Sequence, residues 1–260
     1  MLTVAAAHDV IEAEGLYKSY RTGTVSTPVL QDVTFWVPRG ECLFLVGPSG
    51  SGKTTLLSML GCVLSVDRGA LRILGEDVAR MRAKEQARFR RERLGFVFQR
   101  FHLFEGLKAW ENVRVALDLL GWSPRRARKE SLRLLDLVGL ADRANHRVSQ
   151  LSMGQRQRVA LARALAGDPE LILADEPTAS LDAESGQNAM NILRDLCKSL
   201  GKTAIVVTHD SRIYAMADRI LKLVDGRIVD DQRNSQERLT TVPRAEPRMA
   251  LASLARGGWR

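Results

Sequence analysis

The sequence predicts an α/β fold built around a parallel β-sheet. Three short apolar runs, at residues 42–46, 171–174 and 204–207, have the length and continuous hydrophobicity of strands buried on both faces. A glycine-rich loop follows the first run and polar residues follow the other two, as expected where parallel strands end at one edge of a sheet. Residues 101–147 have a helical pattern instead, so we expect a helical part inserted in the α/β core.

The N-terminal residues predict a small antiparallel sheet. Residues 10–17 and 29–37 alternate apolar and polar side chains, which is typical of strands with one buried face. A further strand is expected at 70–74, followed by a turn at 75–77. Residues 1–9 are expected to be an extension and not a signal peptide, because they lack a basic start and a long apolar run.

A phosphate-binding loop is predicted after the first apolar run. The segment Gly47-Pro48-Ser49-Gly50-Ser51-Gly52-Lys53-Thr54 fits the pattern G-x-x-x-x-G-K-[ST]. Its glycines let consecutive N–H groups turn toward one point, and the helix expected at 54–60 adds an N-terminus that favours an anion. We expect Lys53 to reach the β- and γ-phosphates of a nucleotide and the Thr54 hydroxyl to bind Mg²⁺. A solvated turn is the alternative, and the strand before and helix after the loop argue against it.

Two helices are predicted in the inserted part. The first spans 109–120, and the second begins at Pro124, which suits a first helical position. In the second helix Leu132, Leu135 and Val138 fall on one face, so this face is expected to be buried.

A second anion site is predicted at the end of the helical part, which we place at about 100–165. The run Leu151-Ser152-Met153-Gly154-Gln155-Arg156-Gln157-Arg158 leads into a helix expected at 155–165. The Ser152 hydroxyl and the N–H groups around Gly154 lie at the N-terminus of that helix, where an anion is favoured. Two such sites in one chain indicate one nucleotide clamped between two chains.

Two carboxylates follow the strand at 171–174. An acidic residue at the end of a strand beside the phosphate loop can hold a nucleotide-bound metal ion from the other side, and Asp175 has that position. Glu176 comes one residue later, where its side chain can face the γ-phosphate instead. The alternative, that both residues cap a helix, is disfavoured by Pro177.

The C-terminal part returns to alternating strands and helices. A helix is expected at 183–200, and residues 219–224 and 227–229 are expected to form a closing hairpin. From 232 to 260 Pro, Arg, Ser and Glu dominate and periodicity stops, which predicts a poorly ordered tail.

The phosphate loop, the run at 151–158 and the run Leu171-Ile172-Leu173-Ala174-Asp175-Glu176-Pro177 occur in this order, and together they resemble the nucleotide-binding subunit of an ATP-binding cassette (ABC) transporter. The resemblance implies a P-loop NTPase (RecA-like) core with an antiparallel β-subdomain and an inserted α-helical signature subdomain, over residues 10–231. Within the family the chain is most similar to stand-alone subunits of the macrolide-exporter and lipoprotein-release type. The supporting segments are 23–30, 60–62, 95–103 and 111–113.

The resemblance implies ATP and Mg²⁺ as ligands and three catalytic residues. Glu176 is the implied general base for the attacking water, and His209, after the strand at 204–207, is an implied γ-phosphate contact. Gln99, after a strand at 94–98, matches the glutamine that contacts Mg²⁺ and water and relays the nucleotide state to the membrane partner.

The implied metal ligands are Thr54, Gln99 and Asp175. Tyr20 matches the aromatic position that stacks on adenine, and Tyr17, on the opposite face of the strand, is the competing candidate. The remaining implied nucleotide-binding residues are Gly47, Ser49, Gly50, Gly52, Lys53, Thr54, Thr55, Ser152, Gly154, Gln155 and Asp182.

The implied partners are a transmembrane permease subunit, a second copy of this chain in a head-to-tail ATP-sandwich dimer, and a periplasmic adaptor reached through the permease. Export, lipoprotein extraction and transmembrane force transmission all occur in this group. The alternative is a soluble ABC protein of the DNA-repair or translation-factor kind. Those proteins need a coiled coil, a zinc hook or a second cassette in the same chain, and none is recognisable here.

The sequence departs from the family pattern at three places. Met153 replaces the first glycine of the usual Gly-Gly pair, residues 66–69 lack the expected Pro-Thr-Ser-Gly, and Glu105 and Gly106 stand where proline is common. Only Met153 touches the expected chemistry. A left-handed backbone there would weaken the second anion site, whereas an ordinary negative φ would leave the N–H group competent.

The amino-acid composition limits which other classes of function are expected. The net charge is +9, but the basic residues are dispersed and lack interleaved aromatic residues, so we expect no nucleic-acid partner. Attraction to an anionic membrane surface and ordinary solvated helix faces are both consistent with this charge. No apolar run reaches the roughly 18 residues of a membrane span, so we expect a peripheral position on the cytoplasmic face of the inner membrane. The three cysteines have no metal-binding spacing and are expected to be reduced.

Overall fold

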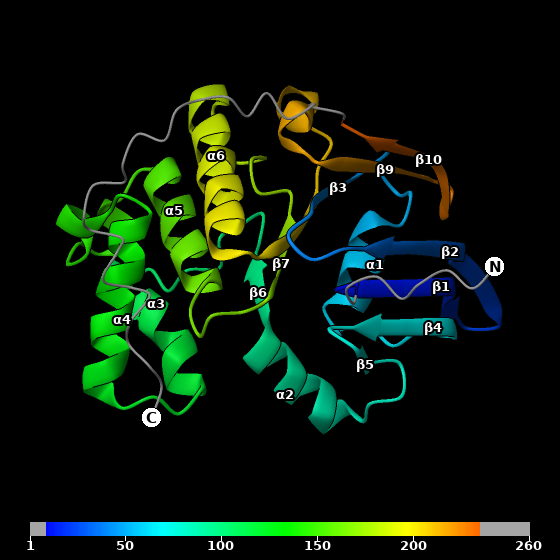
Figure 1. Ribbon diagram of the computed structural model, residues 1–260, viewed down its shortest axis with the longest axis horizontal. Helices are drawn as coiled ribbons and strands as arrows, with labels where there is room; N and C mark the ends of the chain where they lie inside the picture. Colours follow the sequence, from blue (N-terminus) through cyan, green and yellow to red (C-terminus); the bar gives the residue numbers. More distant parts are fainter. Residues whose placement is uncertain (1–8, 235–260) are drawn as a thin grey trace.

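The computed structural model describes residues 9–234, which form two β-sheets and a group of helices (Figure 1). The six-stranded sheet has the order β10-β9-β3-β8-β7-β6, and all neighbours in it are parallel except β10 and β9. Its strands are β3 (Cys42–Val46), β6 (Leu94–Val97), β7 (Leu171–Asp175), β8 (Thr203–Val207), β9 (Arg219–Val224) and β10 (Arg227–Arg233). The parallel sheet predicted from the apolar runs is therefore present.

The second sheet is antiparallel and has the order β2-β1-β4-β5. Its strands are β1 (Ile11–Thr22), β2 (Val25–Val37), β4 (Arg68–Ile73) and β5 (Glu76–Asp77). The first two strands are longer than predicted because they continue into a hairpin whose side chains are largely exposed. Exposed side chains on both faces give no alternation of apolar and polar residues, so the pattern could not detect this part of the strands.

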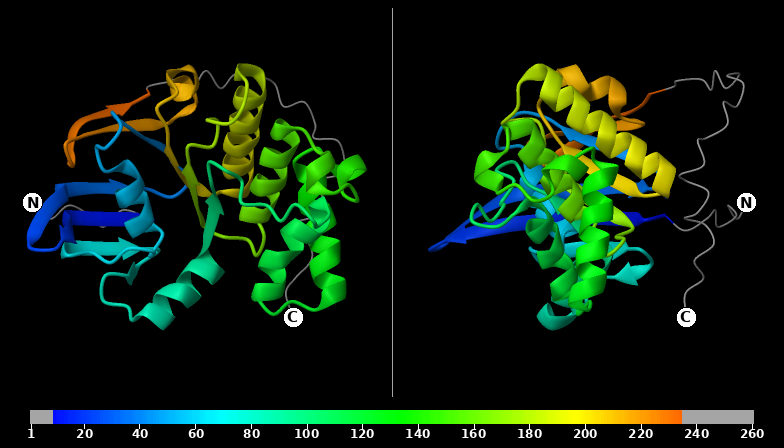
Figure 2. Two further views of the ribbon diagram at one scale, coloured as in Figure 1. Left: turned by 180° about the vertical axis from the view of Figure 1, so that it is seen from behind. Right: turned by 90° about the vertical axis from the view of Figure 1, so that its left-hand side faces the viewer.

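The helices are α1 (Lys53–Leu60), α2 (Ala83–Arg93), α3 (Ala109–Leu119), α4 (Pro124–Leu137), α5 (Met153–Ala164) and α6 (Ala183–Leu200), with short 3-10 turns at Ala141–Arg143, Val148–Gln150 and Ser211–Met216. Helices α3 to α6 lie on one side of the parallel sheet and the small sheet lies on the other (Figures 1 and 2). An α/β core with an antiparallel subdomain and an inserted helical subdomain is thus confirmed.

Alternate residues of the central strand build two separate cores. Cys42, Phe44 and Val46 pack into the core shared with α3 to α6, whereas Leu43 and Leu45 pack with α1 and the small sheet. The continuous hydrophobicity of β3 follows from this, because side chains of a strand alternate between faces and both faces are covered here.

Helix α2 is an element that the sequence pattern did not predict. Only Phe89 among its residues is buried, so the helix has no apolar stripe. It is stabilised instead at its N-terminus, where the Glu85 carboxylate accepts a hydrogen bond from the Arg82 N–H at 2.7 Å, and by the Arg88–Glu92 ion pair at 3.1 Å.

The boundaries of several further elements differ from the predictions; β4, for example, spans Arg68–Ile73 where a strand was expected at 70–74. Helix α5 begins at Met153 and not at 155, because Ser152 caps it. Strand β10 reaches Arg233, although the tail was expected from 232; residues 1–8 and 235–260 lie outside the described residues.

A buried arginine joins the two sheets. Arg219 is 2% exposed; it donates two hydrogen bonds of 2.6 Å to Asp231 on β10 and one of 2.7 Å to the Trp36 carbonyl on β2. Its Nη1 also lies 3.6 Å from the buried carboxylate of Glu41. These bonds hold the pKa of Asp231 below its usual range, and burial raises that of Glu41.

We predict that Arg219→Met lowers the free energy of unfolding by about 3 kcal/mol, because it removes the nearest cation from the buried Glu41 carboxylate and a donor from the Trp36 carbonyl. Urea unfolding at neutral pH measures this loss. The matched variant Arg227→Met removes an exposed arginine from the same hairpin and should cost under about 0.5 kcal/mol. Equal losses for the two variants would contradict the structural role of Arg219.

Candidate functional site

A cavity of about 640 Å³ opens where the parallel strands end. It is lined by the glycine-rich loop after β3, by Gln99 after β6, by Glu176 after β7 and by His209 after β8. These residues come from four distant parts of the chain and meet because parallel strands present their carboxyl ends at one edge. The complete lining is Tyr20, Val29, Gly47, Pro48, Ser49, Gly50, Gly52, Lys53, Thr54, Thr55, Gln99, Glu176 and His209.

Two glycines fit the loop against its surroundings. Gly47 has φ 147°, and a Cβ there would lie 2.0 Å from the Leu223 carbonyl oxygen of β9. Gly52 has φ 101°, and a Cβ there would lie 2.9 Å from the Val29 carbonyl oxygen. Any other residue at these two positions would displace the loop from the sheets behind it.

Helix α1 starts from this loop without a side-chain cap. Its N-cap is Gly52, and no acidic residue stands in its first turn. The first N–H groups of the helix are therefore free for an anion in the cavity. The buried Lys53 ammonium folds back and donates to the carbonyls of Gly47 at 2.9 Å and Pro48 at 2.8 Å, which places its charge at the loop.

The Asp175 carboxylate is half-buried, and one of its oxygen atoms lacks a hydrogen-bond partner. Its Oδ1 atom is buried and has no hydrogen-bond partner, whereas the Thr54 hydroxyl hydrogen-bonds the carboxylate. Burial raises the pKa of Asp175 and the neighbouring Glu176 raises it further, against the opposite effects of Thr54 and Lys53. An unpaired carboxylate oxygen beside a hydroxyl is a donor set that suits a hard cation, so the residues present fit Mg²⁺.

Glu176 turns away from the direction of its strand. Its N–H still donates to the Val207 carbonyl at 2.9 Å, but its φ is +47°, in the left-handed region. This turn brings its Oε1 atom to 2.8 Å from His209 Nδ1, and 69% of the His209 side chain is exposed. The two side chains thus form a pair at the mouth of the cavity, and a positive φ at a non-glycine residue stores about 1–2 kcal/mol.

The two competing tyrosines occupy different surroundings. Tyr20 lines the cavity and is 43% exposed, whereas the Tyr17 ring is covered by the Arg68 guanidinium at 4.4 Å. The structure therefore leaves Tyr20 available for stacking on a base.

The second predicted anion site lies outside this cavity. Ser152 caps α5 by accepting from the Gln155 N–H at 3.2 Å, and Gln155 returns a bond to the Ser152 N–H at 3.0 Å. Asp182 caps α6 by accepting from the Ser185 N–H at 2.9 Å, which holds the pKa of Asp182 below its usual range. None of Ser152, Gly154, Gln155 and Asp182 lines the cavity that contains the phosphate loop.

The N-termini of α5 and α6 meet at this second site. A Cβ on Gly154 would lie 3.2 Å from the Ser185 hydroxyl, so the two helix ends are in close contact. Ser152 and Asp182 consequently lie on one exposed surface, apart from the cavity of the phosphate loop.

A family model described as "ABC transporter" matches residues 30–179, a span that contains the glycine-rich loop, the run at 151–158 and both carboxylates. This chain belongs to the ABC transporter family.

Two curated ABC relatives are macrolide export ATP-binding/permease proteins named MacB. The protein from Shewanella sp. strain W3-18-1 is 45% identical over 228 residues, which cover 87% of this chain and 35% of the relative. The protein from Burkholderia thailandensis is 43% identical over 228 residues, which cover 88% of this chain and 35% of the relative. The chain thus spans about a third of the length of these relatives.

Two solved ABC cassettes share the fold. One is a dimeric structure of a post-hydrolysis state of the ATP-binding cassette MJ0796 bound to ADP and Pi, with a TM-score of 0.78 and 37% identity over 86% of this chain and 98% of the other. The second is cbiO1 from Clostridium perfringens, with a TM-score of 0.79 and 27% identity over 86% of this chain and 88% of the other. The chain therefore has the fold of an ABC cassette, and its relatives are of the transporter type and not of the DNA-repair kind.

Met153 does not distort the ABC signature. It is the first residue of α5 and is absent from the positions with positive φ, so its backbone N–H points as a helical N–H should. Its side chain is exposed. The structural condition for a working signature, a negative φ at this position, is met.

Sequence reasoning missed two residues around the ABC site. Arg163 of α5 donates to the carbonyls of Phe101 and His102, both at 2.6 Å, and thereby holds two consecutive left-handed residues after Gln99. Tyr214 packs nearby, and burial together with Glu176 and Asp210 raises its pKa. No motif predicts Arg163, because its acceptors are backbone carbonyls and any sequence supplies those.

We predict that Asp175→Asn stabilises the nucleotide-free protein. The raised pKa of Asp175 means that its ionised form destabilises the fold above the ordinary carboxyl pKa, and protonation removes this effect as pH falls. The gain should be at most about 1 kcal/mol at pH 7, because the group is only half-buried, and it should shrink toward about pH 4.

Urea unfolding of nucleotide-free protein at several pH values measures this gain. The control is Asp142→Asn, which changes an exposed carboxylate away from the site and should show no such trend. A variant less stable than the wild type at pH 7 would contradict our account of Asp175.

Proposed function

We propose that this chain hydrolyses Mg²⁺-bound ATP at the cavity described above and thereby drives a transmembrane permease from the cytoplasmic face of the inner membrane. The supporting observation is the arrangement around one cavity of a phosphate loop and a Glu–His pair, with the half-buried Asp175 carboxylate, whose Oδ1 atom has no partner, one residue before Glu176. No helix among residues 9–234 combines the length and apolarity that a membrane crossing needs.

Lys53 and the free N–H groups of α1 hold the phosphates in this proposal. The lysine exchanges its bonds to the Gly47 and Pro48 carbonyls for phosphate oxygens, and its buried position gives that charge more effect than it would have in water. Tyr20 stacks on the adenine, since it is the exposed aromatic residue of the cavity lining.

Glu176 is the general base. Its carboxylate is largely buried and reaches the cavity, so it accepts the proton of the attacking water. His209 holds this carboxylate at 2.8 Å and, being mostly exposed, can also turn to donate to the γ-phosphoryl group. Gln99, in the loop after β6, is the third proposed catalytic residue and also lines the cavity.

Thr54, Asp175 and Gln99 would hold the metal ion. When bound, Mg²⁺ supplies positive charge that offsets the charge developing on the phosphoryl oxygens. The hydroxyl of Thr54 already contacts the Asp175 carboxylate, and the free Oδ1 atom leaves that carboxylate one unused oxygen.

A second copy of the chain completes the site. Ser152 and Gly154 lie at an exposed helix N-terminus outside their own cavity, so they can serve only the nucleotide of another subunit. A head-to-tail pair places each γ-phosphate between Lys53 of one subunit and Ser152 of the other, with Asp182 crossing between the two sites. The solved cassette MJ0796 is dimeric.

An apolar groove of about 500 Å³ between α2 and α3 is the proposed docking site of the permease. Phe98, Phe104, Leu119 and Val63 line it and are among the exposed large hydrophobic residues of the structure. Contiguous exposed apolar surface of this kind is typical of a protein partner site. Arg163 lines the same groove and holds the backbone after Gln99, which gives a physical connection between permease and nucleotide.

We further propose that the coupled process is export. Both MacB relatives are named for macrolide export, and their names join an ATP-binding part to a permease in one protein. Extraction of lipoproteins and force transmission across the membrane remain alternatives, and a periplasmic adaptor would be reached through the permease. Purification with the permease and assay of its cargo separates these processes.

We predict that Glu176→Gln lowers ATP hydrolysis by at least about a hundredfold while ATP binding persists, because the amide keeps the shape of the side chain but is a far poorer base. Turnover and ATP-dependent dimerisation of the variant measure the two effects. The γ-phosphate should survive and trap the dimer. Retained turnover without a trapped dimer would remove Glu176 from this role.

We predict that Met153→Gly changes hydrolysis by less than about tenfold, roughly 1.4 kcal/mol, since the methionine backbone is already helical. Gly154→Asp should abolish hydrolysis by placing a carboxylate beside the γ-phosphate of the other subunit. Both variants are assayed in one permease-containing preparation. An active Gly154→Asp variant would show that the signature does not meet nucleotide.

We predict that co-expression with the permease raises ATP hydrolysis and that Leu119→Gln weakens this stimulation, with an association about fivefold weaker. Leu119 is 66% exposed in the groove, and the matched variant Val229→Gln changes an aliphatic residue that is 57% exposed on β10. Stimulation measured against permease concentration compares the two. Equal effects of both variants would place the docking site elsewhere.

A further inference from the structure

A shallow cleft of about 520 Å³ between α3 and α4 is lined by cations and by no carboxylate. Its lining is Arg114, Pro124, Arg125, Arg128, Lys129 and Leu132. We call these six residues the basic cleft. Three of its four cations stand in the first half of α4, where the helix dipole is already positive and no acidic residue occupies the first turn.

Three cations of the basic cleft that lie on α4 have no carboxylate partner in the described part of the chain. Among residues 9–234, no carboxylate lies within ion-pair distance of Arg125, Arg128 or Lys129, and Arg114 alone has a partner, Asp118 at 3.0 Å. An excess of positive charge therefore faces solvent at this cleft, which favours an anionic ligand.

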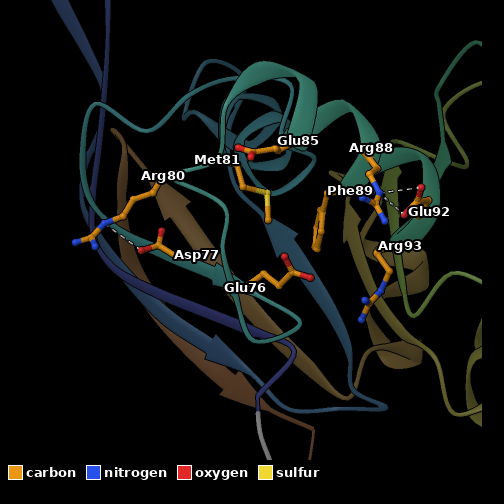
Figure 3. A pocket seen from close by; sticks show the side chains of 9 residues that line it. All are labelled: Glu76, Asp77, Arg80, Met81, Glu85, Arg88, Phe89, Glu92 and Arg93. Carbon is orange, nitrogen blue, oxygen red and sulfur yellow. Dashed lines mark hydrogen bonds and ion pairs between the residues drawn. The ribbon is translucent and has the colours of Figure 1, made fainter.

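A second charged pocket of the protein behaves differently. The pocket of about 580 Å³ at β5 and α2 is lined by residues of both signs that pair with one another (Figure 3). Arg80 pairs with Asp77 at 3.3 Å and Arg88 with Glu92 at 3.1 Å. Internal pairing is thus available to arginines on this fold, and among residues 9–234 three of the four cations of the basic cleft, Arg125, Arg128 and Lys129, lack a carboxylate partner.

Two tryptophans accompany the basic cleft. Arg114 and Arg128 lie 5.9 and 5.3 Å from the Trp110 ring centroid, and Arg126 lies 3.7 Å from that of Trp122. Stacking on a ring holds the guanidinium groups in place. Tryptophan beside arginine is also the pairing that suits the boundary between water and lipid headgroups.

The basic cleft continues the proposed permease groove. Leu119 lies in the groove, and Trp122 and Arg125 follow it within six residues of chain. The loop between α3 and α4 lies at the lower edge of the molecule, the same edge toward which α2 extends, in Figure 1 and from behind in Figure 2. A permease seated in the groove would bring this edge toward the membrane.

We propose that the basic cleft binds the phosphate groups of anionic lipids in the leaflet around the permease. This proposal rests on the proposed function, because the permease defines which edge faces the membrane. Lipid is favoured over an acidic protein segment because the cations are spread over two helices with tryptophan between them, which suits a surface of many phosphates.

The test is binding of the full chain to vesicles of phosphatidylglycerol with phosphatidylcholine, measured by flotation at low salt. The variant carries Arg125→Gln, Arg128→Gln and Lys129→Gln, and the matched control carries Arg194→Gln, Lys198→Gln and Arg227→Gln on α6 and β10. We expect binding about a hundredfold weaker for the variant, at about fivefold for each cation, and little change for the control. A Lys-substituted form, Arg125→Lys with Arg128→Lys, should still bind and separates charge from folding.

Several outcomes would overturn the proposal. These are failure of the wild type to bind anionic vesicles, equal loss in variant and control, binding to phosphatidylcholine alone, and competition by millimolar inorganic phosphate, which would show a free-phosphate site. Binding that appears only when the permease is present in neutral vesicles would show an acidic protein segment instead. ATP hydrolysis by the wild type is measured separately, so its absence would count against the proposed function and not against lipid binding.

Discussion

The parallel register of β3, β8, β7 and β6 is the constraint on which the rest of the structure depends. It aligns four strand ends, and each strand end delivers a different group to one cavity: the glycine-rich loop, His209, Glu176 and Gln99. A slip of one residue in any strand would turn its side chains to the other face and remove its group from the cavity. The two cores on either side hold this register, because alternate residues of each strand are buried in different cores.

The site maintains several locally unfavourable features that the surrounding structure compensates. Asp175 keeps an unpaired buried oxygen, Glu176 has a left-handed backbone, and α1 begins without a side-chain cap. The fold would be more stable if the carboxylate oxygen and the helix end had partners within the protein and if Glu176 had an ordinary backbone conformation. Each feature instead leaves a group free for phosphate, metal or water. Arg163 acts similarly by fixing two left-handed residues after Gln99, so the loop that faces both cavity and groove is held from α5.

The same geometry places the proposed functional residues on two separate surfaces of the chain. The helical part that contains Ser152 is packed by α3, α4 and α5 on one face of the sheet, and Ser152 does not line the cavity of the phosphate loop. The groove between α2 and α3 and the basic cleft between α3 and α4 share α3, and Arg163 of α5 joins the groove to the backbone after Gln99.

Local pattern in the sequence was sufficient for the parallel strands, the phosphate loop and the helices α3, α4 and α6, because glycine spacing and apolar periodicity are properties of neighbouring residues. The same pattern identified Asp175, Glu176 and His209 as polar groups after strands. The ABC resemblance alone pointed to Gln99, and it supplied the roles that we propose for all four residues. The pattern did not predict α2, since a helix with one buried residue has no periodicity to detect.

Only the tertiary structure decided what those residues touch. The Glu176–His209 pair, the unpaired oxygen of Asp175 and the choice of Tyr20 over Tyr17 depend on contacts between segments more than 30 residues apart. The excess charge of the basic cleft was equally hidden, because dispersed arginines along a chain do not show which ones lack a carboxylate nearby. The sequence by itself determined the order of the elements and the types of residue at the strand ends. Distances, burial and unpaired charge required the packed fold, because these properties arise between residues that only folding brings together.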